Sequence, residues 1–293
     1  MRVAVLGCGY VGLELCRQLR DDHDVTGVRR SPAGIERVEA TGARAVQADV
    51  TDADALGAVP DADAVVFAAS SGGRGADAAR EVYVEGLRTA VDQFCGRADP
   101  PDRVVYTSST GVYGDHGGDW VDETTPVEPT TDKTEVLAEA ERTALGRPTG
   151  DCAGTVTRFA GLYGPGRYRL DRYVEGPVTE GYLNMVHRDD AAGAVRYLLE
   201  RGVGRDEVVN VIDDEPVSKW AFADWLAEQC GRDPPRKRTI AERLAEGDLS
   251  APAERRLRTS KRVANDRLRE LGYDFAYPTY REGYRAAVEA DRE

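Results

Sequence analysis

Lysine is nearly absent from this chain, and acidic residues are in excess. The 39 basic residues include only four lysines, Lys133, Lys219, Lys237 and Lys261. The 52 acidic residues give a formal net charge of −13, and a surface of this sign repels polyanions, so we do not expect a nucleic acid partner. Arginine in place of lysine in an acid-rich chain predicts a halophilic protein, because concentrated salt screens charges within ~3 Å. The alternative is an acidic protein from a GC-rich genome.

Long apolar runs and paired cysteines are also missing. No run approaches the ~20 apolar residues that a membrane span requires, so we expect no membrane partner. The five cysteines form neither a Cys-x-x-Cys pair nor a metal-binding spacing, which predicts reduced thiols and no metal. The chain begins in a strand-like stretch and not in a signal-peptide pattern. We expect a cytoplasmic monomer or homodimer whose partner is a small-molecule substrate.

Strand-like and helix-like segments alternate along the first half of the chain. Short β-branched runs lie at residues 2–7, 24–29, 43–49, 62–70, at the start of 104–114, and at 154–164. Apolar residues at helical spacing fill the segments 11–19, 77–94 and 131–145. Such alternation forms βαβ units, which require a parallel sheet with right-handed crossovers. The sequence predicts an α/β fold, a Rossmann-like doubly wound parallel sheet.

The turn LGCGYVG after the first strand predicts a dinucleotide site. Gly7 permits a tight turn, Gly9 lets the backbone approach a pyrophosphate, and Gly12 permits close helix packing. Tyr10 and Val11 lie between them, at a helix N-terminus that offers free N–H groups. The alternative is that these are plain turn glycines.

The end of the second strand predicts which dinucleotide binds. An NAD site usually has an acidic residue there, whereas this chain has Arg29, Arg30 and Ser31. Two guanidinium groups and a hydroxyl suit a 2′-phosphate, so we expect NADP(H) to be favoured over NAD(H). The alternative is a pair of solvated surface arginines.

Four further motifs carry a family resemblance. They are the Ser-Ser-x-x-Val-Tyr-Gly turn at 108–114, the acidic loop Glu123–Pro126, the Arg-x-x-x-x-Tyr-Gly-Pro-Gly segment at 158–166, and the His-x-Asp-Asp-x-Ala helix start at 187. With the glycine turn, they resemble the extended short-chain dehydrogenase/reductases, in particular the atypical branch of NAD-dependent epimerase/dehydratase-like proteins. The resemblance covers most of the chain.

The resemblance implies roles for individual residues. Asp49 and Val50 would contact adenine, and Ala68, Ala69 and Ser70 the cofactor ribose, although both segments could equally be strand-end caps. Ser109 takes the position of the catalytic serine, with a turn cap as its alternative. The substrate side is formed by residues that follow the later strands, namely Thr110, Tyr163, Arg167 and His187.

The family's catalytic Tyr-x-x-x-Lys is missing. Its tyrosine falls on Lys133 and its lysine on Leu137, and no such motif occurs elsewhere. A proton donor is still needed for hydride transfer, and we consider Lys133, Tyr113 and Tyr163, the two tyrosines being expected to face the cleft. The alternative for Lys133, which we favour, is an exposed first-turn lysine.

Two functions therefore remain open from the sequence. The first is an NAD(P)-dependent oxidoreductase or epimerase acting on a polar carbonyl or nucleotide-sugar-like substrate. The second is a catalytically impaired redox sensor or regulatory protein that binds NADP(H). In both, residues 1–166 would form the NAD(P)-binding domain with 183–213 returning to its sheet. Residues 167–182 and 214–293 would form a small C-terminal subdomain on the substrate side.

Overall fold

A parallel seven-stranded sheet forms the centre of the molecule. The computed structural model describes residues 1–71, 75–148 and 150–292. In sheet order the strands are β12 (Glu207–Val211), β7 (Ala153–Phe159), β5 (Arg103–Ser109), β4 (Ala64–Phe67), β1 (Arg2–Leu6), β2 (Asp24–Arg29) and β3 (Arg44–Gln47). Every neighbouring pair is parallel. The order 3-2-1-4-5 with further strands beyond is that of a doubly wound Rossmann-like sheet, so the predicted fold class is confirmed.

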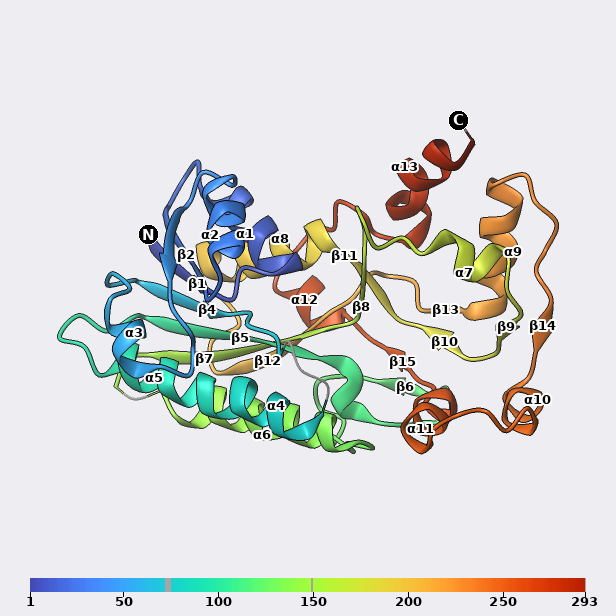
Figure 1. The fold of residues 1–293 in the computed structure, drawn as a ribbon, viewed down its shortest axis with the longest axis horizontal. Helices are drawn as coiled ribbons and strands as arrows, with labels where there is room; N and C mark the ends of the chain where they lie inside the picture. The colour runs from blue at the N-terminus through green and yellow to red at the C-terminus, as the bar shows by residue number, and fades with distance from the viewer. Residues whose placement is uncertain (72–74, 149, 293) are drawn as a thin grey trace.

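Helices cover both faces of this sheet (Figure 1). One face carries α1 (Tyr10–Leu19), α2 (Pro32–Glu39) and α8 (Arg188–Arg201). The other carries α3 (Ala53–Gly57), α4 (Ala76–Arg80), the π-helix η1 (Glu81–Gly86), α5 (Leu87–Cys95) and α6 (Asp132–Gly146). Each face has its own buried apolar cluster, because the β-branched residues of the strands alternate between the two sides.

The segment predicted as one sixth strand is two strands in the structure. β7 ends at Phe159, and β8 (Gly161–Tyr163) pairs instead with β11 (Met185–His187). Ala160 lies at the break and donates its N–H to the carbonyl of Val211, at the end of β12. The chain thus leaves the sheet after β7, and β12 returns to it.

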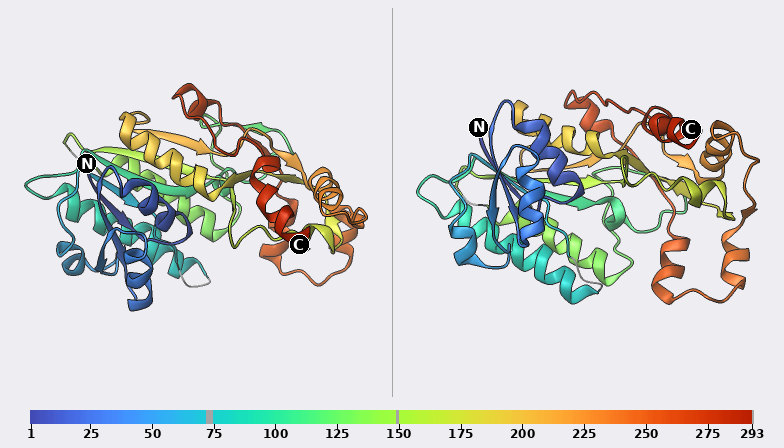
Figure 2. Two further views of the ribbon diagram at one scale, coloured as in Figure 1. Left: turned by 90° about the horizontal axis from the view of Figure 1, so that it is seen from above. Right: turned by 45° about the horizontal axis from the view of Figure 1, so that its top comes forward.

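The remaining elements form a smaller body beside the sheet (Figures 1 and 2). Its helices are α7 (Leu170–Val174), α9 (Lys219–Gln229), α10 (Ile240–Ala245), α11 (Ala251–Arg258) and α13 (Tyr280–Arg292). Its strands form two short ladders, β9 (Val178–Thr179) with β14 (Lys237–Arg238) and β10 (Tyr182–Leu183) with β13 (Val217–Ser218). We call this body the cap. Its role as a separate substrate-side unit stays a prediction.

Contacts between the cap and the sheet domain are close. Helix α13 reaches β8 through Gly283, where an added Cβ would lie 1.9 Å from the Tyr163 hydroxyl oxygen. Two-residue strands β6 (Trp120–Val121) and β15 (Arg262–Val263) pair, and α12 (Asp266–Glu270) follows β15. The Lys261 ammonium donates to the carbonyl of Gly114 at 2.8 Å. Within the described ranges, no helix is long and apolar enough to cross a membrane.

Candidate active site

The glycine turn between β1 and α1 has the shape that a pyrophosphate requires. At Gly7, with φ of +95°, an added Cβ would lie 2.2 Å from Cα of Ala69, and at Gly12 it would lie 2.8 Å from the carbonyl oxygen of Gly7. At Gly9 the nearest atom would be 4.0 Å away, so this position faces open space. No side chain of the described residues caps α1. The free helix N-terminus and the open face at Gly9 fit a dinucleotide.

The turn opens into a cavity of about 300 Å³ at the carboxyl ends of the strands. Its wall comes from the glycine turn, β4, η1, β5, α6 and the β7–β8 region: Gly9, Tyr10, Val11, Gly12, Ala68, Ala69, Ser70, Tyr83, Thr107, Ser108, Ser109, Lys133, Leu137, Phe159, Ala160, Leu162 and Arg167. The structure therefore brings together Ser109, Lys133, Arg167 and most of the predicted cofactor residues. This edge of an open α/β sheet is where ligands bind.

Arg29, Arg30 and Ser31 lie at the end of β2, as expected. The Arg29 Nε atom is buried, and no partner is present for it in the described part of the chain. Its side chain packs on α2, where a Cβ at Gly34 would lie 2.8 Å from this nitrogen. Arg30 and Ser31 are exposed. The exposed Arg30 and Ser31, with the half-buried Arg29 beside them, are open to an anionic group.

Asp49 and Val50 lie after β3 and outside the wall of the cavity. The Asp49 carboxylate accepts from the N–H of Thr51 at 3.1 Å and from its hydroxyl at 2.9 Å. Val50 is buried, and its Cγ2 would lie 2.9 Å from a Cβ at Gly86. Asp49 thus caps the end of β3 through Thr51, while its contact with adenine stays a prediction.

Ser109 both caps a turn and faces the cavity. Its hydroxyl oxygen accepts from the N–H of Gly111 at 3.1 Å, at the start of η2 (Thr110–Tyr113). A hydroxyl that accepts one bond can still donate its hydrogen to a substrate oxygen, so the two roles do not compete. Thr110, also expected on the substrate side, is buried and outside the wall of the cavity.

Tyr113 and Tyr163 do not face the cleft, so that expectation is wrong. Tyr113 is fully buried and donates its hydroxyl to Oδ1 of Asn210 at 2.9 Å, because η2 turns its side chain into the core. Burial raises the pKa of this phenol to about 12. Tyr163 is 3% exposed and stacks on Tyr284, with ring centroids 4.9 Å apart. Neither tyrosine can reach a substrate in the cavity.

His187 begins α8, and Arg167 borders the cavity. His187 is 1% exposed, and its Nδ1 accepts from the N–H of Asp189 at 3.2 Å, which caps the helix. Its pKa is lowered, first of all by burial, with Asp189 opposing the shift. The imidazole is therefore neutral.

The Arg167 guanidinium lies 4.0 Å from the centroid of the Tyr10 ring, above the glycine turn.

A buried ion pair, which the sequence did not predict, lies beneath the cavity. Both oxygens of the Glu141 carboxylate accept from Arg158, at 3.0 and 2.7 Å, and Oε1 also accepts from the hydroxyl of Ser108 at 2.6 Å. Arg158 also lies over the Tyr113 ring, at 4.6 Å from its centroid. The arginine was part of a motif, and Glu141 stands four residues after Leu137. Because residues four apart lie on the same face of a helix, this spacing could have indicated the pair of Glu141 with Arg158.

Tyr83 is the second residue that the sequence argument missed. The segment 77–94 was expected to be one regular helix with Val82 in its apolar stripe. In the structure it contains the π-helix η1, which places Tyr83 on the wall of the cavity. A sequence carries no clear signal for a π-turn, and such turns are frequent at functional sites.

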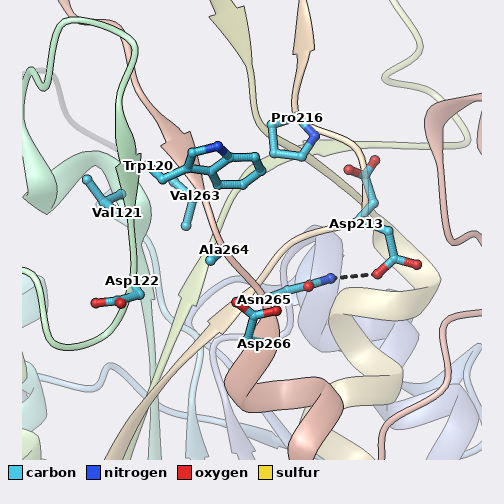
Figure 3. A pocket seen from close by; sticks show the side chains of 10 residues that line it. Trp120, Val121, Asp122, Asp213, Pro216, Val263, Ala264, Asn265 and Asp266 are labelled. Atoms are coloured by element: carbon cyan, nitrogen blue, oxygen red, sulfur yellow. Dashed lines mark hydrogen bonds between the residues drawn. The ribbon is translucent and has the colours of Figure 1, made fainter.

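A second cavity, of about 340 Å³, lies near the β6–β15 ladder (Figure 3). Trp120 forms part of its wall, with several carboxylates around it. Asp122 accepts from Thr124 and Thr125, and Asp214 accepts from Asn265, so these carboxylates have protein partners. In the described residues, no group of three or more histidine, cysteine or acidic side chains is arranged to hold a metal ion. The glycine turn, and with it our candidate site, belongs to the other cavity.

Comparison with known proteins decides the family. Residues 3–211 match the model of the NAD dependent epimerase/dehydratase family. The chain belongs to this family. It is 30% identical to the protein YeeZ of Escherichia coli K12 over 286 residues, covering 94% of this chain and 96% of YeeZ.

Two further proteins are similar over nearly their whole lengths. A 3-diazoavenalumate denitrifying reductase from Streptomyces is 30% identical, with 97% of this chain and 99% of the reductase covered. The human epimerase family protein SDR39U1, solved with NADPH, has a TM-score of 0.81 at 20% identity, with 99% of each chain covered. Our chain, as a member of the epimerase/dehydratase family, therefore has an NAD(P)-binding fold of known type.

Proposed function

We propose that the protein is an NADP(H)-preferring oxidoreductase or epimerase that acts on a polar carbonyl or nucleotide-sugar-like small molecule. The observation that carries this proposal is that the open glycine turn and Ser109 share one cavity. A bound nicotinamide dinucleotide would supply or accept a hydride at this place. A relative that is a reductase and a similar fold solved with NADPH support the same function.

Each part of the cavity has a physical task in this proposal. The backbone of Tyr10, Val11 and Gly12 would bind the pyrophosphate at the N-terminus of α1. Arg29 and Arg30 would bind a 2′-phosphate through charge-assisted hydrogen bonds from their guanidinium groups. Ser109 would donate a hydrogen bond to the substrate oxygen and orient the carbonyl, which is worth more in the transition state than in the ground state.

A redox sensor is the second candidate function. Lys133 and Leu137 stand at the positions of the family's catalytic pair, and Leu137 is a buried apolar residue that cannot take over the lysine's charge. A sensor would keep the dinucleotide site without turnover. The choice between the two functions depends on whether another group of the cavity can move a proton.

Turnover with a panel of carbonyl compounds and nucleotide sugars tests the proposal. The purified protein in concentrated salt should oxidise NADPH with at least one carbonyl compound or epimerise one nucleotide sugar. NADPH absorbance and chromatography of the sugars are the two measurements, and the matched control is Gly9→Val, which fills the open face of the turn. NADPH binding without turnover across the whole panel would contradict the enzyme and favour the sensor.

A further inference from the structure

Tyr83 presents a phenol to the candidate active site from an unexpected element. It lies on η1, between α4 and α5, and borders the same cavity as Ser109. Its side chain is 8% exposed, so the ring is packed while one edge reaches the cavity. A π-turn inserts one extra residue into a helix and re-aims the side chains around it. The helix irregularity therefore coincides with the residue that faces the site.

The hydroxyl of Tyr83 is a hydrogen-bond acceptor within the protein. It accepts from the N–H of Ser71 at 3.3 Å, and the Ser71 hydroxyl lies 3.5 Å away as a second donor. In the described ranges no bond donated by Tyr83 is present. Donors that point at a phenol oxygen stabilise the negative charge that remains when its proton leaves. The O–H of Tyr83 can thus be given to a substrate oxygen.

Lys133 places a positive charge beside this phenol. Its ammonium lies 6.0 Å from the centroid of the Tyr83 ring, and both side chains border the cavity. Lys133 is exposed on the first turn of α6, so it exchanges protons with solvent. A cation at this distance interacts favourably with the face of the ring and with negative charge that develops on its oxygen during a proton transfer.

Tyr10, the other described tyrosine on the wall of the cavity, already uses its hydroxyl hydrogen within the protein. The Tyr10 hydroxyl donates to the carbonyl of Pro165 at 3.1 Å. Tyr113 donates to Asn210, and Tyr163 packs against Tyr284. Among these four tyrosines, and counting only partners in the described ranges, Tyr83 alone combines a place on the wall with a hydroxyl that donates no hydrogen bond.

We propose that Tyr83 and Lys133 form the proton-transfer pair of this protein, with the tyrosine on η1 and the lysine on α6. This inference rests on the proposed function. In the reductive direction, the carbonyl carbon of the substrate accepts a hydride, with its two electrons, from the reduced nicotinamide. The carbonyl oxygen accepts the proton of Tyr83. The products are an alcohol, the oxidised cofactor and a tyrosinate beside the Lys133 ammonium, and solvent returns the proton to the tyrosinate.

Nitration by tetranitromethane tests the pair without any substrate, because this reagent attacks phenolates in preference to phenols. Peptide mapping should find Tyr83 nitrated in the wild type and protected by NADPH. Lys133→Met should slow this nitration by about 2- to 5-fold, the size expected of one exposed cation–π contact. Lys237→Met, which removes another exposed lysine, should leave it unchanged. An equal rate in Lys133→Met and the wild type would overturn the pairing.

Turnover tests the chemical role. With a substrate from the panel, Tyr83→Phe should lower kcat by ~100-fold or more, while the fluorescence-measured Kd for NADPH stays the same. Tyr197→Phe is the matched control, since its hydroxyl binds the carbonyl of Leu271 away from the cavity. Full kcat in Tyr83→Phe would refute the role. A panel without turnover would refute the proposed function instead, so the two failures are distinguishable.

Discussion

Arg29 is the residue on which we base the expected preference for NADPH. Its Nε is buried without a protein acceptor in the described residues, while Arg30 beside it is exposed to solvent. Arg29→Ala combined with Arg30→Ala should raise the Kd for NADPH by ~10- to 100-fold and leave the Kd for NADH within a factor of about 2, because the loss of one hydrogen bond between charged groups costs ~1.5–3 kcal/mol in total. Fluorescence titration in concentrated salt measures both constants.

The control for this double variant must remove the same charge elsewhere. Arg255→Ala with Arg256→Ala changes two exposed arginines of α11 and should leave both constants unchanged. If it weakens NADPH binding equally, the loss comes from net charge, and the assignment of a 2′-phosphate site to Arg29 and Arg30 is wrong.

At the scale of the element, α8 depends on a neutral histidine at its start. Nδ1 of His187 must be unprotonated to accept from Asp189, and burial lowers the pKa of this imidazole below its ordinary 6.5. Between the lowered folded pKa and 6.5 the unfolded chain binds more protons, so stability rises with pH across that window and is lost as the pH falls through it.

His187→Asn should remove this pH dependence, because asparagine also caps helices well and does not titrate. Urea unfolding of wild type and variant at about pH 8 and about pH 5 measures the effect. The wild type should lose more stability on acidification than the variant. Equal losses in the two proteins would show that His187 does not contribute.

The sheet elements were the part of the fold that the sequence predicts well. Runs such as RVAVL and AVVF are β-branched and buried on both faces, and that composition belongs to central parallel strands. The cap was predicted only in outline, because strands of two residues such as β9 and β10 show no periodicity. In the site, the glycine turn follows from local backbone geometry. The directions of Tyr113 and Tyr83 depend on η2 and η1, which tertiary packing decides.

For the whole molecule, charge dominates the response to solvent. The net charge of −13 makes the folded chain repel itself, and concentrated salt screens this repulsion. If the protein is adapted to salt, Tm should rise by about 4–8 °C between ~0.1 M and ~2 M KCl, corresponding to roughly 2 kcal/mol. Thermal unfolding followed by tryptophan fluorescence measures this. A Tm that is flat or falls with KCl would favour the GC-rich genome as the origin of the composition.

The cap is built from two segments of the chain that both follow β7, and this affects the order in which the molecule can fold. Six of the seven sheet strands are complete once the ribosome has made Phe159, since β12 is the only later one. Helix α13, which packs on Tyr163 through Gly283, follows all seven of these strands in the chain. During synthesis these six strands can therefore assemble before either segment of the cap has been made. The nascent protein could accept a dinucleotide at the glycine turn before the cap that would enclose the substrate exists.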